Sequence, residues 1–372
     1  MCPHPPHTAF SQSLLTSRTP CQAPQVPGSM KPSLILFAGL ATASLSASSA
    51  AQAQGIVDDG PFPDGLNGSN YTYPWPVKLF RFTSQLQPLD MAFMDIGPSC
   101  VPNGRTALLL HGKNFCGPTW QTTISTLAAK GYRVIAPDQI GFCRSSKPSG
   151  YQFSLGQLAW NTRGLLGALD VANVTVVGHS MGGMMAARFG LQYRETVDRL
   201  VLVAPVGLED YVQKGVPYIT IDDSLANEAE STYQSIRRYE QNVYYVGRWQ
   251  SSYDTWVHML VNVYHGSKRD AYLRNQAQIV DMVLTSPVSH MLGDLEPRTL
   301  LIVGDKDKTA IGSQWAPPDV AQKLGHFDVL GPQAARRIPR CTLHHFADLG
   351  HAPQISDPRR FHEVLLAWLT AE

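Results

Sequence analysis

The hydrophobic pattern of the chain alternates between short apolar runs and longer amphipathic segments. Four runs are almost continuously apolar, and a Gly or Pro follows each within two residues: 106–110, 132–136, 174–177 and 200–204. Such runs are typical of strands that are buried on both faces. Between them, residues 120–130 and 154–169 place apolar side chains at helical spacing. The alternation predicts a parallel sheet with helices on both faces.

Two further parts of the chain extend this pattern. Residues 77–96 alternate apolar and polar positions, which predicts two strands that turn near residues 85–88. Residues 299–303 and 341–346 predict two later strands. A final helix with one apolar stripe is expected to begin at Pro358.

The interval from residue 207 to residue 297 lacks the strand pattern and is rich in tyrosine. We interpret it as an inserted, mainly helical unit that divides a core made of residues 54–206 and 298–372. The insert is expected to cover the carboxyl edge of the sheet, where ligands bind in folds of this class. Its aromatic rings favour an apolar or aromatic substrate, but each ring can equally serve to pack the insert on the core.

The N-terminal segment, residues 1–53, differs from the rest. Residues 1–29 are rich in Pro, Ser and Thr, and we predict that the natural start is Met30. A basic residue, an apolar stretch of small residues and Ala51-Gln52-Ala53 follow, a layout typical of a secretory signal that is cleaved after Ala53. The apolar stretch is shorter than the roughly 20 residues of a membrane-spanning helix. A secreted or periplasmic protein without a stable membrane anchor is expected.

Composition restricts the function classes. The 372 residues are 44% hydrophobic and 16% charged, with a formal net charge of +1, which is ordinary for a folded globular protein. A nucleic-acid binder needs a basic surplus to neutralise phosphates, and this chain has none. Four cysteines follow the signal segment: Cys100, Cys116, Cys143 and Cys341. In an oxidising compartment they can form one or two disulfides in any of three full pairings, or remain buried thiols.

A serine lies where one central strand meets the next helix. The sequence Gly178-His179-Ser180-Met181-Gly182 follows a β-branched strand directly. A sharp strand-to-helix turn lifts a serine hydroxyl clear of the backbone, where a base can reach it and the helix N-terminus favours negative charge. Glycines are needed because side chains would collide at so tight a bend. We predict that Ser180 is a nucleophile; the alternative is a simple helix N-cap.

Possible partners of Ser180 follow the later strands. Two carboxylates, Asp305 and Asp307, come directly after the strand at 299–303, and His351 lies between the last strand and the final helix. A serine, an acid and a histidine in this chain order form a familiar arrangement for nucleophilic catalysis. We predict that His351 is the base.

These motifs resemble those of the α/β-hydrolase superfamily. The resemblance runs from about residue 77 to residue 372 and includes the segment 137–142. Within that superfamily, the chain is similar to the capped branch that contains haloperoxidase-like hydrolases, epoxide hydrolases, haloalkane dehalogenases and carbon–carbon bond hydrolases. The resemblance implies a mostly parallel sheet of eight strands, with helices on both faces and an inserted helical cap.

The resemblance also assigns roles to residues. The family spacing makes Asp307 the acid, with Asp305 in reserve and Asp210 as a weaker third candidate. The backbone N–H groups of Lys113 and Met181 are the candidate oxyanion donors. Four side chains are candidates for substrate binding: Asn114, His179, Tyr244 and Trp249. Neither a metal nor an organic cofactor is implied.

The identity of the nucleophile narrows the function. Dehalogenases and epoxide hydrolases of this fold attack with Asp, whereas Ser180 implies an acyl-enzyme. We therefore predict hydrolysis of a small-molecule carboxylic ester, lactone or related acyl compound. Carbon–carbon bond hydrolases also use Ser, but their turn commonly has Asn where this chain has His179, so they are the alternative. A non-catalytic small-molecule receptor on the same fold is the alternative of another class.

Overall fold

The computed structural model describes residues 55–57 and 65–371. The expected signal segment, its cleavage site after Ala53 and the start at Met30 lie outside the described residues. Within the described ranges, no helix combines the length and the apolar composition that a membrane crossing requires.

A single sheet organises the described residues. Its nine strands there are ordered β1-β2-β3-β5-β4-β6-β7-β8-β9. The pairs from β5 through β9 are parallel, and β1, β2 and β3 are antiparallel additions at one edge. The eight strands β2–β9 confirm the predicted sheet, and the short β1 extends it. The strands are β1 (Gly55–Val57), β2 (Val77–Ser84), β3 (Gln87–Ile96), β4 (Thr106–Leu110), β5 (Arg133–Pro137), β6 (Val174–His179), β7 (Val197–Val203), β8 (Arg298–Gly304) and β9 (Cys341–Phe346).

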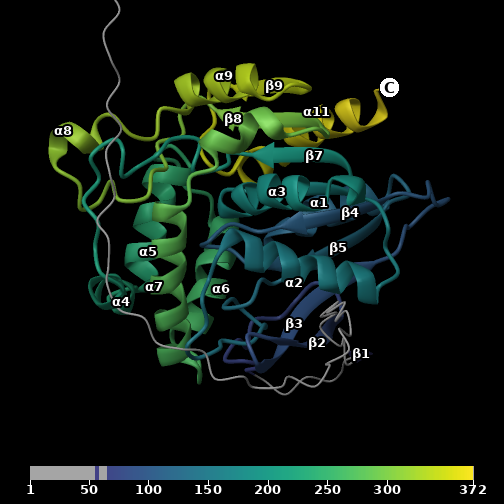
Figure 1. Ribbon diagram of the computed structural model, residues 1–372, viewed down its shortest axis with the longest axis horizontal. Helices are drawn as coiled ribbons and strands as arrows, with labels where there is room; N and C mark the ends of the chain where they lie inside the picture. The colour runs from purple at the N-terminus through teal and green to yellow at the C-terminus, as the bar shows by residue number, and fades with distance from the viewer. Residues whose placement is uncertain (1–54, 58–64, 372) are drawn as a thin grey trace, which may run out of the picture. The chain divides into compact units, whose positions relative to one another are not determined.

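Helices cover both faces of this sheet, as Figure 1 shows. The helices α1 (Gln121–Ala128) and α11 (Pro358–Thr370) pack on one face, while α2 (Leu155–Ala168), α3 (Met181–Gln192) and α9 (Phe327–Arg337) pack on the other. Successive residues of the central strands point to opposite faces: Leu108 belongs to one hydrophobic core and Leu109 to the other. This explains why the runs are apolar at every position.

The interval 207–297, which we call the helical insert, contains four α-helices among its described residues. They are α4 (Ile221–Ala229), α5 (Tyr233–Tyr239), α6 (Asp254–Tyr264) and α7 (Arg269–Thr285). In Figure 1 they gather beside one end of the strands. A π-helical turn, Glu240–Tyr244, continues α5. Short 3-10 turns at Ser251–Tyr253 and Ser289–Asp294 complete the insert.

The boundaries of most elements agree with the sequence pattern. Strands β4 and β9 coincide with the predicted ranges, and Asp357 caps α11 by accepting a hydrogen bond from the Arg360 backbone N–H at 3.1 Å. The helix predicted at 120–130 begins as a 3-10 turn, Gly117–Trp120, before α1. Two helices between β8 and β9 were not expected: α8 (Pro318–Ala321) and α9.

Candidate active site

Ser180 lies at the turn between β6 and α3, with φ 57° and ψ −120°. A non-glycine residue in this region of backbone space is strained, so the surrounding packing must hold it. A Cβ at Gly178 would collide with the Gly182 carbonyl, and one at Gly182 would collide with the Leu110 carbonyl. The predicted need for glycines on both sides of the serine is therefore met. The Ser180 side chain does not cap α3 and lines a cavity instead.

His351 and Asp307 form a buried pair after β9 and β8. Their Nδ1 and Oδ2 atoms are 2.7 Å apart, and neither side chain is exposed. The second oxygen of Asp307 accepts the backbone N–H of Thr309 at 2.8 Å. Because Nδ1 faces a carboxylate, it carries the proton, and Nε2 is free to act as an acceptor. Nε2 is buried and has no partner among the described residues.

The other two candidate acids face elsewhere. Asp305 lies 3.0 Å from Nδ1 of His345, not beside His351. Asp210 accepts the backbone N–H of Gln213 at 2.9 Å and caps a local turn. Of the three candidates, Asp307 is the one that the structure brings to His351.

The two candidate oxyanion donors lie near Ser180 and line the same cavity. Met181 begins α3, and Lys113 lies in the loop after β4. Neither backbone N–H donates a hydrogen bond to another atom of the described residues. Both residues line the same cavity as Ser180. Two unpaired N–H groups beside a nucleophile are the feature that stabilises a tetrahedral oxyanion.

His179 supports the loop that carries His351. Its Nε2 donates to the His351 backbone carbonyl at 2.8 Å, and the two rings are 4.8 Å apart. Burial lowers the pKa of His179 well below its ordinary value, and the nearby His351 lowers it further. His179 is thus a neutral positioning residue, and the prediction that it binds substrate is not supported, because it does not line the cavity.

Tyr244 also contacts His351, and Asn114 contacts Tyr244. The Tyr244 ring is 4.7 Å from the His351 ring, and its hydroxyl accepts from Asn114 Nδ2 at 3.0 Å. Both residues line the cavity, in agreement with their predicted place near the substrate. Trp249 does not: it packs against Tyr245 and Tyr253 and donates to Asp254 at 3.1 Å. Its ring therefore stabilises the helical insert, which corrects the prediction for this residue.

The cavity has a volume of about 460 Å³ and lies between the carboxyl ends of the strands and the helical insert. Its polar lining includes a chain of contacts that was not anticipated. Lys113 Nζ pairs with Glu228 of α4 at 2.6 Å, and the Tyr264 hydroxyl donates to the other oxygen of Glu228 at 2.5 Å. No local signal could reveal the pairing of Lys113 and Glu228, because 115 residues separate them.

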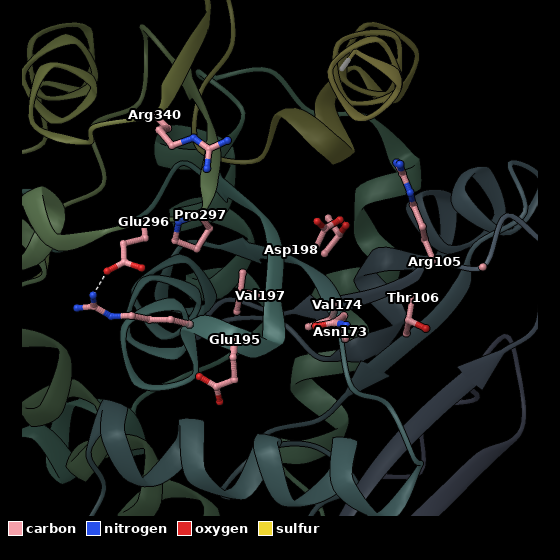
Figure 2. A pocket seen from close by; sticks show the side chains of 13 residues that line it. Arg105, Thr106, Asn173, Val174, Glu195, Val197, Asp198, Glu296, Pro297 and Arg340 are labelled. Atoms are coloured by element: carbon pink, nitrogen blue, oxygen red, sulfur yellow. Dashed lines mark hydrogen bonds and ion pairs between the residues drawn. The ribbon is translucent and has the colours of Figure 1, made fainter.

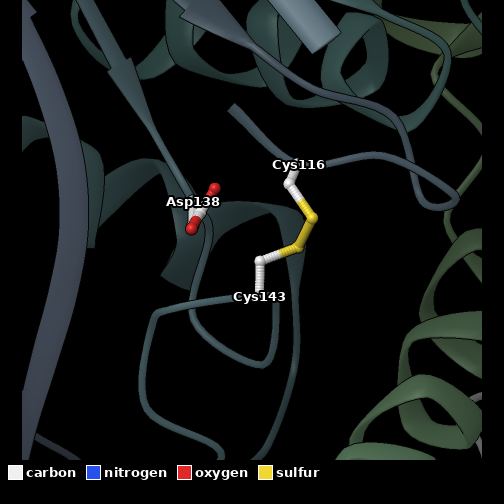
Figure 3. Close-up of side chains that lie close together, drawn as sticks. All are labelled: Cys116, Asp138 and Cys143. Carbon is white, nitrogen blue, oxygen red and sulfur yellow. A yellow bond between two sulfur atoms is a disulfide. The ribbon is translucent and has the colours of Figure 1, made fainter. Parts of the chain in front are cut away.

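A disulfide supports the loop that carries Lys113. Cys116 and Cys143 are bonded and fully buried, with Cα atoms 6.0 Å apart, and Cys100 and Cys341 are free. Figure 3 shows the bond beside Asp138. These three residues are close enough together to suggest a metal site. However, the sulfurs are bonded to each other and Asp138 accepts hydrogen bonds from Gly117, Arg144 and Tyr73, so the group is structural.

A second cleft, of about 490 Å³, lies at the amino ends of the parallel strands. Figure 2 shows that charged side chains of both signs surround it, among them Arg105, Asp198 and Arg340. Arg194 and Glu296, which also line it, form an ion pair. It contains none of the residues that surround Ser180. The cavity at Ser180 is therefore the candidate active site.

Comparison with known proteins is consistent with this geometry. The family profile described as alpha/beta hydrolase fold matches residues 107–245. The crystal structure of a probable hydrolytic enzyme from Pseudomonas aeruginosa PAO1 is 50% identical, covers 81% of this chain and 96% of its own, and has a TM-score of 0.80. The chain therefore belongs to the α/β-hydrolase fold family, which confirms the predicted family and fold.

Two curated relatives match this chain at lower identity than the structure above does, and one of them matches over a shorter stretch. An uncharacterized protein of Mycobacterium tuberculosis is 41% identical over 106 residues, which are 28% of this chain and 30% of that protein. The chain thus matches less than a third of the first curated relatives' length. A 2-hydroxy-6-oxo-2,4-heptadienoate hydrolase of Pseudomonas putida is 24% identical over 297 residues, covering 73% of this chain and 91% of that protein.

Proposed function

We propose that this protein is a serine hydrolase that cleaves carboxylic esters or lactones through an acyl-enzyme on Ser180. The observation that supports this best is the buried His351–Asp307 pair, whose Nε2 lacks a partner, in a protein that presents a serine hydroxyl at a sharp strand-to-helix turn. A base that is oriented by a carboxylate and left free at its second nitrogen is suited to accept a proton from a nucleophile.

In the proposed reaction, Ser180 Oγ attacks the acyl carbon while His351 Nε2 takes the hydroxyl proton. The carbonyl oxygen becomes an oxyanion, which the N–H groups of Lys113 and Met181 stabilise. When the intermediate collapses, the carbon–oxygen bond to the alcohol breaks, and the alcohol leaves with the proton from His351. Water then attacks the acyl-enzyme, gives a proton to His351, and releases the acid as Ser180 recovers that proton.

The test is labelling with a fluorophosphonate probe, followed by peptide mapping. The folded protein is expected to be labelled at Ser180 and to hydrolyse aryl esters, and Ser180→Ala is expected to lose both properties. Ser356, whose hydroxyl donates to the Ala352 carbonyl at 3.0 Å, provides a matched control because Ser356→Ala removes a serine outside the cavity. Undiminished esterase activity in Ser180→Ala would contradict the proposal. Tight ligand binding without turnover would favour the receptor alternative.

Carbon–carbon bond hydrolysis is the second candidate, and the likeness to the heptadienoate hydrolase supports it. A dienoate substrate carries a carboxylate, which calls for a cation without a partner. The Lys113 side chain lines the cavity but is already paired with Glu228 at 2.6 Å. Parallel assays with an aryl ester and a 2-hydroxy-6-oxo-dienoate separate the two candidates, and we expect the ester to react faster.

Two further parts of the proposal concern the whole chain. We propose that the helical insert acts as a cap over the substrate, because α4 and α6 supply cavity residues such as Ser224 and Leu260. We also propose export, with a signal segment that is removed after Ala53. N-terminal sequencing of protein recovered from a periplasmic or secreted fraction tests this, and a chain that begins before Gln54 would contradict it.

A further inference from the structure

The cavity at Ser180 has two unlike walls. One is apolar and includes Val206, Leu260, Val280 and Val283. The other comes from α4, which presents Ser224, Asn227 and Glu228 to the cavity, and from Ser231 just beyond the C-terminal end of that helix. Ser224, Asn227 and Glu228 are spaced i, i+3 and i+4, so they form a single stripe along the helix. A helix that covers a cavity usually turns apolar side chains toward it, whereas the side chains that α4 turns toward this cavity are polar.

The charges in the cavity cancel. Among the described residues that line it, Lys113 and Glu228 are the charged side chains, and they are paired with each other. Tyr264 occupies the second oxygen of Glu228. Burial raises the pKa of Tyr244 and of Tyr264 well above the ordinary value, so both phenols stay neutral. The lining therefore offers hydrogen bonds to a ligand but no free charge.

One buried hydroxyl in the lining lacks a partner. Thr309 is 3% exposed, and its Oγ1 makes no hydrogen bond to any described residue. Its backbone N–H donates to Asp307, which places it beside the candidate acid. A buried polar atom without a hydrogen bond is energetically costly, because it has lost its contact with water. A hydroxyl group on a bound ligand would remove this cost.

We propose that the substrate is an uncharged acyl compound that carries at least one free hydroxyl group. This inference rests on the proposed serine hydrolase. The hydroxylated part of the substrate lies against the polar stripe of α4 and near Thr309. The apolar part lies against the wall that contains Val206 and Val283. A carboxylate in the same place would compete with Glu228 for Lys113, and an ammonium group would compete with Lys113 for Glu228.

The experiment compares esters that differ only in hydroxyl groups. Glycerol 1-monobutyrate is paired with propyl butyrate, and ethyl 3-hydroxybutyrate with ethyl butyrate, so that each half of the ester is examined separately. Monoethyl succinate adds a charged arm. The wild type is expected to favour the hydroxylated member of at least one pair by about tenfold in kcat/KM, the worth of one or two good hydrogen bonds.

Variants locate the preference in the cavity. Ser224→Ala/Asn227→Leu removes two polar groups of the stripe, while Glu230→Gln changes an exposed residue at the end of the same helix. The double variant is expected to lose about tenfold in kcat/KM for the preferred hydroxylated ester and less than twofold for its partner. The Glu230→Gln control should match the wild type on every ester.

The outcomes distinguish this inference from the proposed function. If Ser180 is labelled and both plain esters are hydrolysed without any preference for hydroxyl groups, the inference is wrong and the hydrolase stands. Equal losses on both members of a pair, or a preference for monoethyl succinate, would also overturn it. If no ester is hydrolysed and Ser180 is not labelled, the proposed function fails first.

Discussion

The two ends of the parallel strands use their polar groups in opposite ways. At the amino ends, Arg199 and Arg298 donate to the backbone carbonyls of Leu369 and Ala371 at 2.5 and 2.7 Å, so they satisfy the C-terminus of α11. Arg105 also donates to the Leu369 carbonyl, at 3.3 Å. These guanidinium groups neutralise the negative end of a helix, and their hydrogen-bonding capacity is used for structure.

At the carboxyl ends, polar groups are buried yet left without partners. His351 Nε2 and Thr309 Oγ1 have none among the described residues, and the Ser180 hydroxyl makes no hydrogen bond there either. Both ends of the sheet contain clefts of similar volume, about 490 and 460 Å³. Volume therefore does not identify the functional end. What distinguishes the carboxyl end is that the hydroxyl groups of Ser180 and Thr309 line one cavity and have no partner among the described residues.

The largest effect should come from the candidate acid, Asp307. The neighbouring carboxylate, Asp305, provides a direct control. Asp307→Asn keeps the size of the side chain but removes the charge that orients His351, and kcat should fall by roughly 10⁴-fold. Asp305→Asn changes a residue that faces His345 and should stay within about twofold of wild type. Steady-state kinetics on an aryl ester measures both. A larger loss for Asp305→Asn would reverse the assignment of the acid.

Removal of the disulfide should affect stability next most. The bond closes a loop with a sequence separation of 27 residues, and its loss in Cys116→Ala/Cys143→Ala should cost about 3–4 kcal/mol of unfolding free energy. Urea denaturation measures this. Cys100→Ala, at an exposed free cysteine, is the control and should change stability by less than about 0.5 kcal/mol. A phosphine reductant should destabilise the wild type but not the double variant; equal sensitivity would contradict the prediction.

Glu240 gives an effect on stability that depends on pH. The side chain is fully buried without a hydrogen-bond partner among the described residues, and burial raises its pKa well above the ordinary value of 4.5. The folded protein therefore holds this proton more tightly than the unfolded chain does. Its contribution to stability is complete below pH 4.5 and is lost as the pH rises toward the folded pKa.

The variant Glu240→Gln cannot ionise, so it should escape that loss. Its unfolding free energy should match the wild type near pH 4.5 and exceed it by about 1.4 kcal/mol for each further pH unit until Glu240 ionises in the folded protein. Urea denaturation at pH 5, 6 and 7 measures the gap, with Glu230→Gln as an exposed control. A gap that does not grow with pH would show that the carboxyl is not protonated when folded.

The smallest effect should come from the amino end. Arg298→Met keeps the apolar stem but loses the hydrogen bond to the Ala371 carbonyl and the contact of the guanidinium with the Trp368 ring, 5.1 Å away. The unfolding free energy should fall by about 1–2 kcal/mol while kcat/KM stays unchanged. Denaturation and ester kinetics on the same preparation measure both quantities. A loss of activity at unchanged stability would contradict the division between the two ends.

The parts of the molecule that the sequence predicts are those with local causes. The apolar runs specify the central strands, because a strand buried on both faces must be apolar at every position. The turn around Ser180 and the loop of His351 are recognisable because each lies directly after such a strand. The preference for Asp307 over Asp305 came from family spacing, and the structure brings Asp307 to His351.

The unpredicted parts depend on contacts between distant segments. Nothing near Lys113 indicates that it pairs with Glu228, and nothing near Trp249 indicates that its ring packs inside the helical insert and not toward the cavity. The pairing of Cys116 with Cys143 likewise requires two loops to meet. Helix α9 was missed because Pro332 lies inside it and obscures the helical pattern.

The glycine before His351 has a practical consequence for changing substrate preference. A Cβ at Gly350 would lie 2.5 Å from the Tyr244 carbonyl and 3.0 Å from the Val246 side chain, so the backbone after α5 rests directly on the loop of His351. The segment from Tyr244 to Val246 therefore packs as part of the core, although it belongs to the helical insert. Exchange of α4 with a relative's helix can therefore alter recognition, whereas a graft that includes Tyr244 would also displace the base.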